Sequence, residues 1–300
     1  MASELVRQLV DAGIHFGHRA SRWNPKMAPY IYGKRNTIHI IDIRETVKGL
    51  LRAKKFIAQI VSGGKDVLFV GTKRQAKLII ETEAARAGMP FVTERWLGGT
   101  LTNFRTIRSR LARLEELEQA EADGTAMEYS KKMISTRARE QRKIHRNLQG
   151  IREMDKLPGA VVVVDVHREH SAVREAKKLG IPTICLIDTD SDPDFADLPI
   201  PGNDDAIRAI QTIVAHLADA VEEGKKGRSA APDTTSKDQA PRRRSTRPTM
   251  GRAEEGSPEA IAAQASEKPS APTVPGTDGS EAGVSPAGKD DPDLKTASTG

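Results

Sequence analysis

Three short and almost wholly apolar runs constrain the fold of this chain more than any other feature. They lie at residues 66–70, 159–164 and 182–187, and a stretch with helical periodicity follows each of them. Apolar runs of this length are typical of strands buried on both faces of a parallel sheet. We expect one more strand at residues 90–93. The alternation predicts an α/β fold, in which a parallel sheet carries helices on both sides.

Two long helical stretches interrupt this alternation before the run at residues 159–164. Residues 104–122 carry apolar side chains at helical spacing, and residues 129–154 resume the pattern after an Asp-Gly break. Two helices of this length joined by a few residues predict an antiparallel helical hairpin. We expect it to be an insertion, at about residues 104–154, that protrudes from the α/β domain.

The last quarter of the chain has a different composition. Residues 225–300 contain 12 Lys and Arg, 11 Asp and Glu, nine of the 17 prolines and no aromatic residue. Such a segment cannot bury enough apolar surface to offset the entropy lost on ordering, so we expect it to be disordered. Residues 1–224 then form the folded domain. Its net charge is +5, because the tail contributes 12 − 11 = +1 of the total of +6, which favours an anionic partner without proving one.

An arginine-rich stretch, RWLGGTLTNFRTIRSRLARL, covers residues 95–114 and joins a glycine turn to a helix. Arg95 precedes the turn, and Asn103 is of a type that caps helices. Arg105 and Arg108 lie away from the apolar positions of the predicted helix. A loop of exposed donors before a basic helix suits the phosphate backbone of a nucleic acid. A loop followed by an ordinary solvated helix is the alternative, and both interpretations stay open on this stretch alone.

Residues 15–42 interleave cations with aromatic side chains. The candidate binding residues in this segment are Arg22, Trp23, Lys26, Lys34 and Arg35. Aromatic rings and guanidinium groups stack on exposed RNA bases, and lysines pair with phosphates. The segment also reads as a β-hairpin of residues 30–32 and 37–41 that turns at residues 33–36. The two interpretations are compatible, and we favour contact with nucleic acid.

The sequence GTKRQAK follows the first apolar run and precedes a helix. A glycine in this position can receive a phosphate at the helix N-terminus. However, the loop lacks the spacing of a Walker motif, and no GxGxxG follows the strand. We therefore expect Lys73, Arg74 and Lys77 to bind RNA phosphates rather than a nucleotide cofactor.

Acidic residues crowd the chain after the last apolar run, and Asp188, Asp204 and Asp205 are the candidates for a metal site there. Helix capping and Asx turns are the alternative, which we favour. His15 and His18 are three residues apart, a spacing that can bind a metal, although structural or RNA-contacting roles suit them better. We expect no metal ion and no cofactor.

Other features argue against an enzyme and against a membrane protein. No paired base and nucleophile and no cofactor fingerprint is present. Cys185 is the only cysteine and lies in an apolar run, so we expect a buried small hydrophobe and a reducing compartment. No apolar run is long enough to span a bilayer, and the N-terminus does not read as a signal peptide.

Four motifs in order resemble those of one known family. They are HFGHRASRWNPKMAPYIYGKRNTIHIID, FVGTKRQAK, RWLGGTLTNF and IDTDSDPD followed by IPGNDDAIRAI. Together they resemble the bacterial form of the family of small-subunit ribosomal protein 2, from near the N-terminus to about Glu222. The resemblance implies a flavodoxin-like, three-layer αβα fold with an inserted coiled-coil hairpin. It also implies a cytoplasmic place on the solvent side of the small subunit, between head and body.

The same resemblance implies the partners: 16S rRNA, neighbouring ribosomal proteins and ribosomal protein 1, which has OB-fold domains and binds mRNA. It implies no membrane and no small-molecule substrate. By position it covers residues 23–26, 73–74 and 95–104. The arginine-rich arm STRAREQRKIHRNLQ and the tail with RRRSTR at residues 242–247 depart from the common core. We predict RNA contacts at Arg22, Trp23, Lys26, Lys34, Arg35, Lys73, Arg74, Lys77, Arg95, Trp96, Asn103, Arg105, Arg108, Lys131, Lys132, Arg137 and Arg139.

Two other classes of protein compete with an RNA-binding structural protein. A nucleotide- or metal-dependent α/β enzyme would use the acids at the strand ends and would show turnover. A coiled-coil adaptor without an RNA role predicts that neutralising Arg105 and Arg108 leaves RNA affinity unchanged.

Overall fold

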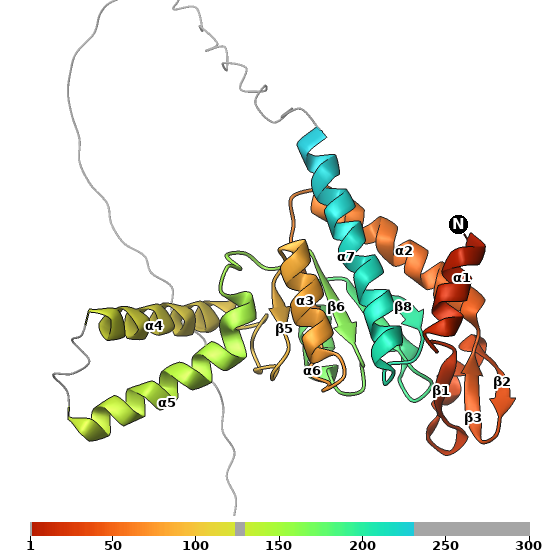
Figure 1. The fold of residues 1–300 in the computed structure, drawn as a ribbon, viewed down its shortest axis with the longest axis horizontal. Helices are drawn as coiled ribbons and strands as arrows, with labels where there is room; N and C mark the ends of the chain where they lie inside the picture. Colours follow the sequence, from red (N-terminus) through yellow and green to blue (C-terminus); the bar gives the residue numbers. More distant parts are fainter. Residues whose placement is uncertain (1, 124–129, 231–300) are drawn as a thin grey trace, which may run out of the picture. The chain divides into compact units, whose positions relative to one another are not determined.

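The computed structural model describes residues 2–123 and 130–230, and its centre is a five-stranded parallel sheet (Figure 1). In spatial order the strands are β5 (Phe91–Val92), β4 (Val67–Val70), β6 (Ala160–Val164), β7 (Thr183–Ile187) and β8 (Leu198–Pro201). The four predicted strands are confirmed. We did not predict β8, because its sequence LPIP contains two prolines, which cannot donate to a ladder. It lies at the edge of the sheet, where proline is tolerated.

Helices cover both faces of this sheet. In chain order, the α-helices of the described residues are α1 (Ala2–Asp11), α2 (Ile43–Ser62), α3 (Lys77–Ala87), α4 (Phe104–Ala122), α5 (Lys131–Leu148), α6 (His170–Lys178) and α7 (Ile207–Ala230). Phe69 and Val162 belong to one core cluster, which they share with α2, α3 and α7. Val70 and Val163 belong to a second cluster, with α6 and the start of α4. The arrangement is consistent with a flavodoxin-like fold and follows from the alternation of side chains along a strand.

Cys185 is wholly buried in the second core cluster. Burial raises the pKa of its thiol to about 12, so the thiolate that a nucleophile needs does not form near neutral pH. The prediction of a buried small hydrophobe is confirmed.

A second, antiparallel sheet lies near the N-terminus, in the order β1-β3-β2. Its strands are β1 (Phe16–Arg19), β2 (Ile31–Arg35) and β3 (Ile38–Ile41). The predicted hairpin is confirmed, but it turns at Asn36 and Thr37, not at residues 33–36. Both turn residues have positive φ, at 46° and 69°, which is the type I′ pattern that two-residue hairpin turns favour.

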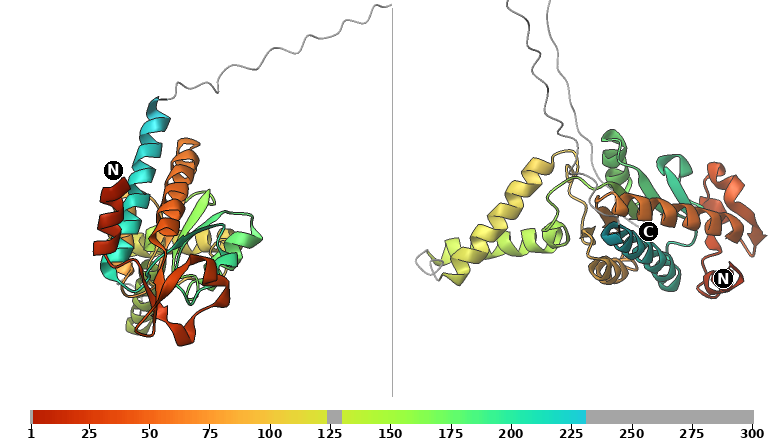
Figure 2. Two further views of the ribbon diagram at one scale, coloured as in Figure 1. Left: turned by 90° about the vertical axis from the view of Figure 1, so that its right-hand side faces the viewer. Right: turned by 90° about the horizontal axis from the view of Figure 1, so that it is seen from above.

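The helices α4 and α5 form a contacting pair (Figures 1 and 2). The amide of Gln141 donates to the carboxylate of Glu121 at 2.8 Å. The predicted pair of helices is confirmed, whereas its coiled-coil packing stays a prediction. α5 was expected to reach residue 154 but ends at Leu148, before a 3-10 turn that includes Gly150. Any side chain at Gly150 would collide with the carbonyl of Phe91, so only glycine fits where the chain passes β5.

The last helix is longer than the sequence indicated. We expected disorder from Lys225, but α7 continues to Ala230. Residues 225–230 therefore continue the helix that packs on α2 and α3. Residues 231–300, including RRRSTR, lie outside the described residues. In the described ranges no helix is long and apolar enough to cross a membrane.

Candidate nucleic-acid interface

The loops at one edge of the parallel sheet carry many of the predicted binding residues. Val70 ends β4 and pairs with Val92 of β5 on one side and Val163 of β6 on the other. The loops after these three strands therefore start at the same level. This register brings together residues that lie more than 90 positions apart in the sequence.

The carboxylate of Glu175, on α6, organises the loop after β5. It accepts hydrogen bonds from the indole Nε1 of Trp96 at 3.1 Å and from the backbone N–H of Gly99 at 2.8 Å. It also accepts from the backbone N–H of Leu101 and Thr102, at 3.1 and 3.2 Å. Gly99 has a φ of 91°, a conformation that glycine adopts without a Cβ penalty. The loop is thus wrapped around a single carboxylate, that of Glu175.

The same bonds set the protonation of Glu175. Burial by itself raises the pKa of this carboxyl, but the hydrogen bonds from Gly99, Trp96, Thr102 and Leu101 stabilise the charged form and outweigh burial. The net pKa lies below its usual value. Glu175 is therefore ionised at neutral pH and holds the loop in place.

Trp96 requires a correction. We predicted that it contacts RNA, but its side chain is only 9% exposed and belongs to the second core cluster. A ring that packs in the core cannot stack on a base. Trp96 instead anchors the loop that carries its exposed neighbours. Trp23, by contrast, is 37% exposed and lies against His39, with ring centroids 5.1 Å apart.

The exposed side chains around this loop differ in their partners. Arg95 and Arg105 are exposed, and neither has an ion-pair or hydrogen-bond partner among the described residues. Asn103 is exposed and its side-chain oxygen accepts from Thr106 Oγ1 at 2.8 Å. Arg108 already has an ion-pair partner, because its Nη1 lies 2.8 Å from a carboxylate oxygen of Asp155. Arg95 and Arg105 are therefore the freest cations in this region.

The three predicted lysines of the sheet edge are all paired with carboxylates. Lys26 Nζ lies 2.8 Å from Asp192 and 2.5 Å from Asp194. Lys77 Nζ lies 3.0 Å from Glu94. Lys73 is held most tightly, and its partners are Asp204 at 2.7 Å, Asp205 at 2.7 Å and Asp165 at 3.3 Å. An RNA phosphate would have to compete with these carboxylates, so the lysines are weaker candidates than the arginines.

The acidic cluster contains the predicted metal candidates. His18, Asp188 and Asp204 place ligand atoms within 4.8 Å of one another. His18 Nδ1 lies 3.0 Å from Asp188, and its Nε2 lies 3.2 Å from Asp205. Asp205 is outside the group of three, although we named it with the others. This is a donor set of one imidazole and two carboxylates that a divalent cation can use.

Lys73 and a protonated His18 offset part of the negative charge of this cluster. The contact with Asp188 raises the pKa of His18 to about 9, despite partial burial. Burial and the neighbouring carboxylates raise the pKa of Asp204 to about 7, while Lys73 opposes them. Burial lowers the pKa of Lys73, but Asp204 and its other acidic neighbours outweigh this and raise it. The cluster is thus a structural ion-pair network that also fits a cation.

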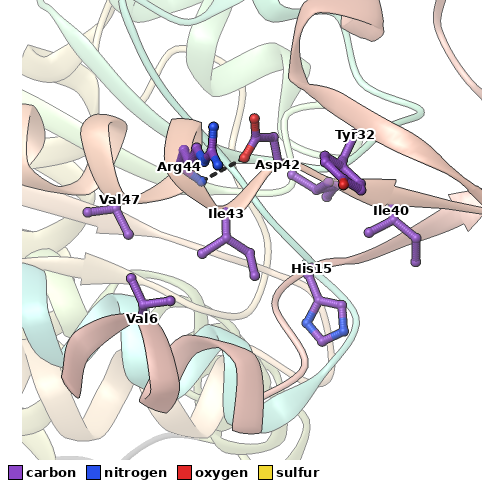
Figure 3. Close-up of a pocket in the computed structure, with 9 residues that line it drawn as sticks. Val6, His15, Tyr32, Ile40, Asp42, Ile43, Arg44 and Val47 are labelled. Carbon is purple, nitrogen blue, oxygen red and sulfur yellow. Dashed lines mark hydrogen bonds between the residues drawn. The ribbon is translucent and has the colours of Figure 1, made fainter. Parts of the chain in front are cut away.

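His15 does not join this cluster in the described residues. It lines a mostly apolar pocket of about 580 Å³ with Val6, Tyr32, Ile40 and Val47 (Figure 3). The two histidines of the HxxH pair therefore have different surroundings, so they do not form the metal pair that their spacing allowed.

The loop after β4 lies at the point where the chain order of the strands reverses, the usual ligand crevice of such sheets. Here Glu169, which is 2% exposed, accepts hydrogen bonds from the backbone N–H of Thr72 at 2.9 Å and from its hydroxyl. The backbone N–H and the hydroxyl of Thr72 are therefore bonded to the carboxylate of Glu169 and are not free to bind a nucleotide phosphate.

The remaining predicted residues lie on two separate surfaces. Arg22, Lys34 and Arg35 are exposed in the N-terminal segment. Lys131, Lys132 and Arg139 are exposed on α5, whereas Arg137 is half-buried. At about 100° per residue, the outer third of α5 gathers six exposed cations: Lys131, Lys132, Arg139, Arg142, Lys143 and Arg146. None of the six has a carboxylate partner in the described ranges.

We missed Arg168, Glu169 and Glu175 in the sequence. Arg168 follows the end of β6 by four residues, as Arg74 follows the end of β4. That equal offset is a signal which could have identified it. Glu175 carries no such signal, since its partners are more than 70 residues away.

Comparison with known proteins assigns this chain to a family. A family model described as "Ribosomal protein S2" matches residues 9–224. A protein named small ribosomal subunit protein uS2, from Rhodopirellula baltica, is 63% identical over 225 residues. The aligned region covers 75% of this chain and 86% of that relative. Every predicted RNA-contacting residue falls inside the matched range.

Proposed function

The chain belongs to the ribosomal protein S2 family, and on that premise we propose that it binds 16S rRNA and neighbouring ribosomal proteins as a structural constituent of the small subunit. The family is one of ribosomal structural proteins and is not a family of enzymes. Binding is then the whole mechanism, in the bacterial cytoplasm, with no cofactor and no small-molecule substrate.

One observation carries this proposal: exposed cations without a carboxylate partner occur on three surfaces of the described residues. The first is the N-terminal hairpin with Lys34 and Arg35. The second is the sheet edge with Arg95 and the start of α4 with Arg105. The third is the outer face of α5. Each cation that reaches a phosphate releases counterions, and several separate basic surfaces suit the irregular shape of folded RNA.

The helical pair extends this function away from the sheet. We propose that it is the coiled-coil insertion of the α/β domain, and that the basic face of α5 lies on a second rRNA segment. The second half of α4 carries Glu115, Glu116, Glu118 and Glu121. Arg113 pairs with Glu116, and Arg152 pairs with Glu118 and Glu115, so we assign no RNA contact to this half. Docking of ribosomal protein 1 rests on family membership alone.

Sedimentation of a cell lysate tests the proposal. The protein should travel with small subunits and whole ribosomes at low salt, and high salt should release it, because bonds to phosphates weaken steeply with ionic strength. A protein that stays at the top of the gradient at low salt would contradict the proposal. The acidic cluster should then be assayed for metal-dependent turnover.

A further inference from the structure

We propose that Arg168, Arg74 and Arg95 form one phosphate-binding site for the backbone of the rRNA, at the carboxyl ends of β6, β4 and β5. The inference rests on the proposed function and deepens it, because it assigns a composite contact site that includes a residue outside the recognised motifs. The three arginines lie on three separate loops, and the parallel sheet brings these loops together.

The register of the sheet places the three residues at one level. Arg74 and Arg168 each follow the last residue of their strand by four positions, and Arg95 follows its strand by three. β4 is hydrogen-bonded to both β5 and β6. Neighbouring strands lie about 4.8 Å apart, so the long arginine side chains can reach adjacent phosphates of one strand of RNA.

Arg168 is oriented by a chain of hydrogen bonds. Its Nε donates to the hydroxyl of Thr72 at 3.1 Å. That hydroxyl donates to the buried carboxylate of Glu169, which also accepts the backbone N–H of Thr72. The bond uses only the inner nitrogen of the guanidinium. Neither Nη group has a hydrogen-bond partner among the described residues, so the fork that pairs with phosphate is preorganised and open.

The three arginines differ from the nearby lysines in their ion pairing. Lys73 and Lys77 start from the same edge, and carboxylates neutralise both. Arg74, Arg95 and Arg168 are exposed and form no ion pair within the described ranges. At β7 and β8 the same edge of the sheet is acidic, because Asp188 follows β7 and Asp204 follows β8 in the chain. The edge thus has one half that attracts a phosphate backbone and another half that repels it.

The test uses the full-length protein and small-subunit particles from which this protein has been removed by a high-salt wash. Binding is measured over a range of salt concentrations. The variant Arg168→Gln should bind roughly threefold to tenfold more weakly, and the slope of log K against log salt should fall by about one. The triple variant R74Q/R95Q/R168Q should lower the slope by about three.

Arg168→Lys separates charge from geometry. It keeps the charge, so the salt slope should stay unchanged, while the loss of the planar fork should still weaken binding. Arg174→Gln is the matched control, because Arg174 is exposed on α6 away from the strand ends, and it should bind like the unmodified protein. Equal melting temperatures for all variants exclude a folding defect.

The outcomes distinguish the two proposals. If the unmodified protein binds the particles and Arg168→Gln binds with the same affinity and slope, the phosphate site is wrong while the proposed function stands. If the unmodified protein does not bind the particles at all, the proposed function fails first, and the phosphate site fails with it.

Discussion

The indole Nε1 of Trp96 donates a hydrogen bond to the carboxylate of Glu175 at 3.1 Å, across 79 residues of sequence. The same carboxylate also accepts backbone N–H groups of the following loop. A single side chain on α6 therefore holds several backbone groups of this loop, in which Trp96 and Leu101 are buried and Leu97 packs against the core.

We predict that Glu175→Ala lowers the free energy of unfolding by about 1–3 kcal/mol, because it leaves several N–H donors without their acceptor. Chemical denaturation followed by tryptophan fluorescence measures this change. Glu153→Gln is the control, since Glu153 is exposed and forms no ion pair in the described ranges, and it should have almost no effect. An equal, small effect of both substitutions would contradict the anchoring role.

The lowered pKa of Glu175 predicts a pH dependence with a definite sign. A carboxyl whose folded pKa lies below its unfolded value stabilises the protein above the unfolded pKa, near 4.5, and the stabilisation is lost as pH falls through the folded pKa. The difference in stability between the unmodified protein and Glu175→Gln should therefore be largest near neutral pH and shrink below about pH 4.5. A difference independent of pH would show that charge is not involved.

His18 provides the opposite case. Its pKa of about 9 exceeds the ordinary value of 6.5, mainly through the contact with Asp188. The resulting stabilisation is full below pH 6.5 and is lost as pH rises through 9. Titration of the imidazole by NMR, in the presence of a metal chelator, should give a midpoint near 9. A midpoint at the ordinary value would show that Asp188, Asp190 and Asp205 do not act on the ring.

Lys73 should be more important for stability than for RNA affinity. Its side chain is 11% exposed, and removing it leaves the 1%-exposed Asp204 without its cation. Lys73→Met should therefore lower the free energy of unfolding by roughly 3 kcal/mol or more. Lys48→Gln breaks the exposed pair with Glu45 and should cost less than about 1 kcal/mol. Comparable losses for the two variants would mean that Lys73 is screened by water.

The basic face of α5 should contribute several phosphate contacts. Replacing Lys132, Arg139, Lys143 and Arg146 by Gln should weaken association with depleted small subunits and lower the salt slope by up to about four. Three exposed cations on other helices, Arg52, Lys55 and Arg208, provide a control with similar charge removal. If both sets change the slope equally, net charge rather than the α5 surface explains the binding.

Much of the fold was predictable from local patterns. The apolar runs at residues 66–70, 159–164 and 182–187 identified three buried strands, since burial on both faces excludes polar side chains. We missed β8 because its two prolines argue against a strand, and proline is tolerated in a sheet only at the edge. The end of α5 was also misplaced, because the apolar pattern continues to Ile151, whereas the chain after Leu148 forms a 3-10 turn in contact with β5.

The α/β class, the helical pair and the cation-rich segments could be predicted from the sequence, because they depend on residue type and on spacing along the chain. Which of the cations are available to a partner could be seen only in the folded chain. Lys73 is neutralised by Asp165, Asp204 and Asp205, whereas Arg168 is oriented by Thr72 and stays open. Charge pairing depends on distances in space, and those distances are set by the order and register of the strands.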